Sequence, residues 1–81
     1  MALARGVATF VATDTASFTW TDYLTGAPLV LGSAPVVLSC AVTSTDGTVQ
    51  AATLQGNPTT SGGTAKVLGS FSGTVTYLAT G

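Results

Sequence analysis

The residues with the chemistry to act as acids or bases are few and stand far apart. The sequence has no His and no Glu, and its three carboxylates are Asp14, Asp22 and Asp46. General acid–base catalysis near neutral pH requires a His or a pair of carboxylates tuned differently by their surroundings. The spacing offers neither, so the sequence predicts a protein that is not an enzyme.

The same carboxylates are the candidate metal ligands, with Cys40 as the only thiol. Calcium takes six or more oxygen ligands, and no closely spaced run of Asp supplies them. One Cys without any His cannot build a zinc site. Asp46 has a simpler role, because Asp followed by Gly47 is a strong hairpin signal. We therefore expect no metal and no cofactor.

Cys40 lies in the middle of an alternating apolar segment, between Leu38 and Val42. No basic residue stands near it in the sequence to lower its pKa and activate it. The pattern predicts an inert, buried side chain on the inner face of a strand. A single Cys also excludes an intrachain disulfide.

Trp20, Asp22 and Tyr23 form the best candidate for a carbohydrate-binding patch, because exposed rings beside a carboxylate suit sugar stacking. The competing interpretation is structural. A domain of 81 residues has few large side chains and needs nearly all its rings for the core. The structural interpretation is the stronger of the two.

Size and charge exclude further classes of protein. The chain of 81 residues forms one domain, and only 6% of its residues are charged, two of them basic. Two cations are too few for the phosphate contacts that drive nucleic-acid binding. No apolar run approaches the roughly 20 residues that cross a bilayer. A core this small without disulfide or metal is marginal, so we expect an oligomer.

The apolar pattern has a period of two residues throughout, which predicts strands and no substantial helix. The expected fold is all-β, a small antiparallel β-sandwich or barrel of six to seven strands. Asp46 and Gly47 should turn the chain so that residues 48–55 pair back on the preceding strand. Residues 56–63 are expected to form a long, flexible polar loop. The expected strands are residues 5–13, 17–21, 29–31, 35–43, 48–55, 65–71 and 74–80.

The amino-terminal residues Met1, Ala2, Leu3 and Ala4 are apolar and precede the first expected strand. We expect them to form an arm that contacts a neighbouring subunit or the larger assembly on which the chain docks. The alternative is that they extend the first strand within their own subunit.

Two segments carry a resemblance to a known family. Pro35-Val36-Val37-Leu38-Ser39 and the closing Tyr77-Leu78-Ala79-Thr80-Gly81 resemble H-type lectin-like modules. That resemblance implies a six-stranded antiparallel sandwich that assembles as a trimer, as in bacteriophage tail fibres. It does not extend to the family's sugar-binding residues. In composition the chain also resembles the small, charge-poor decoration (cement) proteins of tailed-bacteriophage capsids.

These observations lead to a structural virion protein on the outer surface of a capsid. As a decoration protein it would bind itself as a homotrimer, bind the major capsid protein and clamp neighbouring capsomers. The alternative is a lectin-like receptor-binding tip of a head fibre or tail fibre, which would bind carbohydrate. A third class is an adaptor or ring component at a phage neck or tail. No nucleic-acid or membrane partner is expected.

Overall fold

A computed structural model describes residues 2–45, 47 and 51–81 of the chain. These residues contain four strands, β1 (Leu3–Asp22), β2 (Val36–Ser44), β3 (Ala52–Leu54) and β4 (Gly62–Thr80). All pairs are antiparallel, in the order β1-β4-β2, and β3 pairs with β4. The prediction of an all-β, antiparallel fold is confirmed.

Two long strands replace four of the short ones that the sequence predicts. β1 and β4 pair from Leu3 opposite Thr80 to Thr19 opposite Gly62. The register shifts between Phe10 and Thr15, where a turn was expected, and Ala12 has a positive φ of 49°. A bulge bends a strand without ending its pairing. The chain therefore bends between Phe10 and Thr15 while it stays in one strand. As a result, the described residues form four strands where six to seven were expected.

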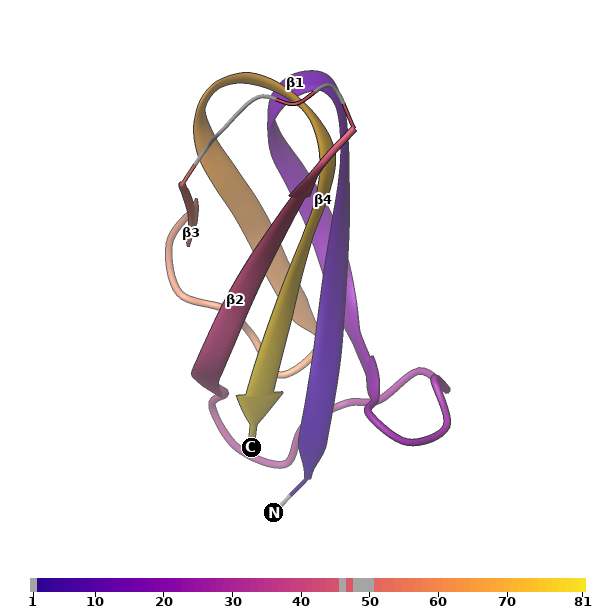
Figure 1. Cartoon of the computed structure of the whole chain (residues 1–81). Coiled ribbons are helices and arrows are strands. Elements are labelled where there is room, and N and C mark those ends of the chain that lie inside the picture. The colour runs from indigo at the N-terminus through magenta and orange to yellow at the C-terminus, as the bar shows by residue number, and fades with distance from the viewer. Residues whose placement is uncertain (1, 46, 48–50) are drawn as a thin grey trace.

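The bends fold the sheet over on itself. Figure 1 shows β1 and β4 curving at the end opposite the termini, so that the first half of β1 faces its second half across the molecule. The buried side chains come from both halves of these two strands and form one cluster. Rings from the two halves meet there, since Phe18 stacks on Tyr77 with ring centroids 5.2 Å apart. These core residues are Ala4, Ala8, Phe10, Phe18, Trp20, Leu31, Ala65, Val67, Phe71, Val75, Tyr77 and Ala79.

The prediction that residues 48–55 pair back on the preceding strand is wrong for β3. Ala52 pairs with Val67 and Leu54 with Ala65, so β3 joins β4 rather than β2. In this position Ala52 and Leu54 pack against the core. The hydroxyl of Tyr77 also donates a hydrogen bond to the carbonyl oxygen of Thr53, 2.8 Å away. Asp46 and residues 48–50 lie outside the described residues.

β2 has a register shift that changes which side chains share a face. Val37 lies opposite Ala79, whereas Cys40 lies opposite Tyr77 after a shift between Val37 and Ser39. Opposed residues in an antiparallel pair project from the same face of the sheet. Cys40 therefore lies on the inner-facing side, as predicted, but it is exposed rather than buried. The short β3 does not extend over it.

Candidate interaction surface

The two described carboxylates, Asp14 and Asp22, take part in separate interactions. Asp14 pairs with Lys66 across 3.4 Å, and both side chains are about half exposed. Asp22 accepts hydrogen bonds from the backbone N–H groups of Leu24 and Thr25, at 2.8 and 3.2 Å. No group of three Asp, Glu, His or Cys side chains suitable for a metal ion occurs within the described part of the chain. Asp22 therefore has a local structural role, since it holds the turn that follows β1.

Trp20 does not offer a surface for stacking a sugar. Its side chain is 1% exposed and packs edge-to-face against Phe18, with ring centroids 5.0 Å apart. The indole Nε1–H donates a hydrogen bond to the carbonyl oxygen of Thr59 at 2.9 Å. The backbone N–H of Trp20 donates to the carbonyl of Ser61. The carbohydrate patch proposed from the sequence thus loses its largest ring, because the core takes it.

Tyr23 is the exposed member of the same trio. Its side chain is 39% exposed, and the guanidinium carbon of Arg5 lies 5.0 Å from its ring centroid. A guanidinium over a tyrosine ring is a favourable cation–π arrangement. Arg5 thereby covers one face of the ring, and Trp20, Asp22 and Tyr23 do not form one polar and aromatic platform.

The described part of the amino-terminal segment belongs to the sheet. Ala2 and Gly81 exchange two backbone hydrogen bonds, at 3.1 and 3.2 Å. Leu3 and Ala4 are already in β1, and Ala4 is fully buried opposite Ala79. The segment therefore extends the first strand, and the expectation of a separate arm is wrong for these three residues. Met1 lies outside the described residues.

Residues 56–63 were expected to form the most flexible loop, but Gly62 and Gly63 already belong to β4 and the loop before them is tied to the fold. Thr59 accepts the Trp20 indole hydrogen bond, and its N–H donates to the carbonyl of Gly62 at 2.7 Å. The N–H of Leu31 donates to the carbonyl of Thr60 at 2.8 Å. These bonds close the end of the core near Trp20.

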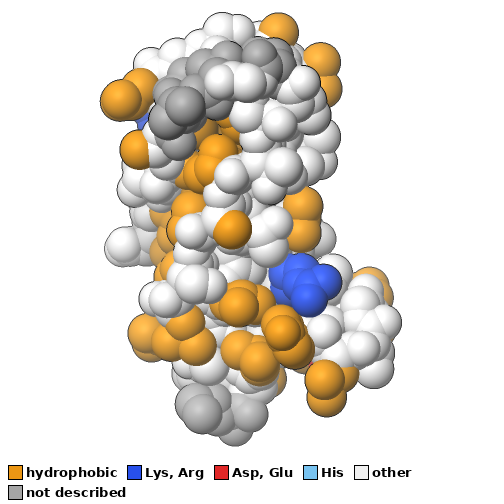
Figure 2. Space-filling model, in the orientation of Figure 1, with side chains coloured by type: hydrophobic (Ala, Val, Ile, Leu, Met, Phe, Trp, Pro, Cys, Tyr) orange, Lys and Arg blue, Asp and Glu red, His pale blue; other side chains and the backbone are white. Residues whose placement is uncertain are grey.

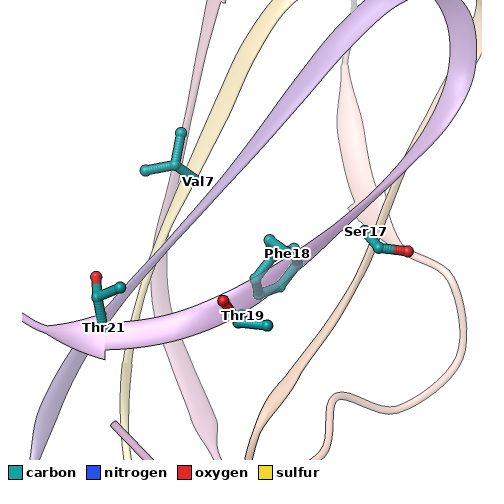
Figure 3. A pocket seen from close by; sticks show the side chains of 5 residues that line it. All are labelled: Val7, Ser17, Phe18, Thr19 and Thr21. Atoms are coloured by element: carbon teal, nitrogen blue, oxygen red, sulfur yellow. The ribbon is translucent and has the colours of Figure 1, made fainter. Parts of the chain in front are cut away.

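A groove of about 400 Å³ runs between the two halves of β1 (Figure 3). Val7 projects from the first half, while Ser17, Thr19 and Thr21 project from the second. The Thr21 hydroxyl donates to the carbonyl oxygen of Arg5 at 3.1 Å and links the two halves. The lining has hydroxyl and apolar groups but no ionisable side chain. Within this lining no ionisable group is present to activate the hydroxyl groups as nucleophiles.

The clearest surface feature is an apolar patch at the end of the molecule that carries both termini. We call it the end patch. Leu24 and Val30 lie in the connection between β1 and β2 and are 89% and 73% exposed. Figure 2 shows hydrophobic side chains gathered at the surface of this end. We define the end patch as the exposed large apolar residues of the strand ends and of the connection at this end, namely Leu3, Tyr23, Leu24, Val30 and Val36.

The sequence pattern did not reveal the end patch as a unit. Its residues come from β1, from β2 and from a connection that reads as an ordinary loop with a brief strand. Folding places both strand ends and that connection at one end of the sheet. Of the five residues in the end patch, only Leu3 was predicted from the sequence to contact another protein chain.

Cys40 and Tyr77 form the one pair of titratable groups with resolved pKa changes among the described residues. Burial is the main cause that raises the pKa of the Tyr77 hydroxyl from 10.0 to about 12, and the neighbouring Cys40 thiol contributes to the same increase. Desolvation raises the pKa of Cys40, while its hydrogen bond with Tyr77 acts in the opposite direction. Both groups are therefore neutral near pH 7, and Cys40 lacks the lowered pKa of a catalytic thiolate.

No helix that could span a membrane occurs in the described ranges. Comparison of the chain with protein-family models, with curated proteins and with solved structures finds no match.

Proposed function

We propose that the chain is a structural virion protein, a homotrimeric decoration protein that binds the major capsid protein on the outer surface of a capsid. The observation that carries the proposal is the end patch, in which Leu24 and Val30 are 89% and 73% exposed. Exposed apolar side chains that gather at one place mark a surface that is covered in the working state. The virion setting rests on the resemblance to charge-poor decoration proteins.

The chemistry of the end patch supports a permanent contact rather than a transient one. The charged residues next to it, Arg5 and Asp22, are engaged with Tyr23 and with the turn at Leu24. Binding would then draw on apolar burial, at about 25 cal/mol per Å² of apolar area, summed over the copies in the assembly. A rigid sheet end held by the Ala2–Gly81 hydrogen bonds presents this surface at low entropic cost.

The receptor-binding alternative loses support from the site. It depended on Trp20 as an exposed stacking ring, and Trp20 is 1% exposed.

The experiment is to locate the chain in purified virions from the source of the gene. Quantitative mass spectrometry and electron microscopy should find many copies on the outer surface of the head. A few copies on a tail, or none on the particle, would overturn the proposal.

A matched pair of variants tests the end patch itself. Leu24→Lys should reduce occupancy on particles at least tenfold, because it places a charge in an apolar contact. Leu68→Lys is the control, since Leu68 is 90% exposed but lies in the first half of β4, outside the end patch. Equal occupancy of both variants would exclude the end patch as the capsid contact.

A further inference from the structure

We propose that two copies of the chain pair through β2, edge to edge, so that the sheet continues across a twofold axis at Ala41. The inference concerns the free chain in solution and a different surface from the end patch, so it does not depend on a capsid.

The free edge of β2 is the first observation. β2 is the last strand in the order β1-β4-β2, and within the described residues it pairs with β4 alone. Each of the five residues 39–43 is exposed. An edge strand presents a row of unpaired N–H and C=O groups, which is a template for pairing with another strand. The occupant that satisfies such a row is an extended strand.

The second observation is that residues 39–43 lack the usual devices that prevent pairing. Natural edge strands carry Lys, Pro or a bulge where association must be avoided. β2 has no charged residue and no Pro, and its one register shift lies before Ser39. From Ser39 to Ser44 its ladder with β4 is regular. The stretch after the shift can therefore accept a second strand along its other edge.

The third observation selects a second copy as the occupant. An antiparallel pair related by a twofold axis at Ala41 places Ser39 opposite Thr43 of the other copy, and Cys40 opposite Val42. Hydroxyl then meets hydroxyl on the outer face, and small apolar groups meet on the inner-facing side, which are favourable cross-strand pairs. No charge opposes its own copy. Moving the axis to Cys40 would bring the irregular Leu38 into the ladder, so Ala41 is the better centre.

The pairing would also cover apolar side chains of β2 that are exposed in the single chain. Cys40 and Val42 lie opposite the buried Tyr77 and Val75, yet Cys40 is exposed and Val42 is 36% exposed. A second β2 alongside covers part of this inner-facing side. One strand pair is a small interface, so we expect a dissociation constant on the order of micromolar. A twofold contact closes on itself, and with the proposed trimer it would join two trimers.

Charge substitution at Ala41 tests the inference. Ala41 lies opposite Thr76 on the outer face and is exposed, so Lys or Glu fits the folded monomer. At the axis the new charge faces its own copy. Ala41→Lys and Ala41→Glu, each alone, should raise the dissociation constant about tenfold or more in analytical ultracentrifugation. An equimolar mixture of the two should restore association, because opposite charges then meet at the axis.

Several outcomes would overturn the pairing. A wild-type chain that sediments as a monomer throughout the micromolar range excludes it. The species to follow is the twofold one, a dimer or, with the proposed trimer, a pair of trimers, and a trimer that persists in the variants does not count against the pairing. A twofold species that survives both single charges places the contact elsewhere, and a mixture that fails to recover it excludes a self-contact at Ala41. Leu68→Lys is the control and should associate like the wild type. Circular dichroism and thermal melting should show that all variants remain folded. Loss of pairing with normal particle occupancy would leave the proposed function intact.

Discussion

Gly6 lies directly against the ring of Phe18, and a Cβ atom at Gly6 would overlap that ring. The two residues belong to opposite halves of β1, 12 positions apart in the sequence, and the bend brings them together. Phe18 in turn stacks on Tyr77, with ring centroids 5.2 Å apart. The absence of a side chain at Gly6 therefore sets how closely the folded sheet closes on its aromatic core.

Gly6→Ala should destabilise the chain by about 1–3 kcal/mol, because the added methyl group overpacks a filled core. Gly32→Ala is the matched control, since a Cβ there meets nothing within 4 Å. Urea unfolding of both variants measures the difference in free energy. Equal stability of the two would contradict the close contact between Gly6 and Phe18.

Trp20→Phe should lower the free energy of unfolding by about 1–3 kcal/mol. The variant leaves the Thr59 carbonyl without its donor and opens a small cavity. In the wild type, the fluorescence of Trp20 should resist quenching by acrylamide, because the indole is 1% exposed. Tyr23→Phe serves as the control and should change stability by no more than about 0.5 kcal/mol. If acrylamide readily quenched the fluorescence of the native protein, Trp20 would be at the surface and its burial would be contradicted.

The stability of the chain should fall between about pH 10 and pH 12. Burial raises the pKa of Tyr77 from 10.0 to about 12, so the folded chain retains this proton after the unfolded chain has lost it. The contribution is complete below pH 10 and is lost as the pH rises through 12. We expect a loss of roughly 2–3 kcal/mol, measured by urea unfolding across this range.

Tyr77→Phe isolates that contribution. The variant removes the hydroxyl that donates to Thr53, so it should be less stable near neutral pH by about 1 kcal/mol. It should also lose the extra decline between pH 10 and pH 12 that the wild type shows. If both proteins decline in parallel, the pH dependence comes from other groups.

Cys40 should react completely with a thiol reagent in the folded protein, because it is exposed. Desolvation raises its pKa, so the reaction should be slow near neutral pH and accelerate as the pH rises. Labelling kinetics under native conditions measure both features. If the thiol reacted only after unfolding, Cys40 would be buried, as the sequence predicted, and its exposed position would be contradicted.

Stability and particle attachment should depend little on salt. The ion pair of Lys66 and Asp14 is about half exposed on both sides, so Lys66→Ala should cost no more than about 0.5 kcal/mol. Particles should keep the chain in about 1 M NaCl, because apolar contacts are not screened. Release of the protein by that salt concentration would show an ionic attachment.

The sequence by itself determined the class of fold. Alternation with a period of two and the many β-branched residues are local properties, and they predicted an all-β antiparallel structure without helices. The scarcity of charge is likewise a property of composition. For the proposed contact residues Met1, Ala2, Leu3 and Ala4, the sequence indicated apolar character but left open whether they extend the first strand, as Leu3 and Ala4 do in the structure.

Tertiary structure decided where strands end, which strands pair and which faces are covered. The segment between Phe10 and Thr15 bends β1 rather than ends it, because pairing with β4 continues on both sides of the register shifts. β3 joins β4 because its apolar side chains reach the core there. Trp20 is buried and Cys40 is exposed for a related reason. A side chain is buried only where the opposite half of the folded sheet lies over it. Contacts between residues far apart in the chain determine where that half lies.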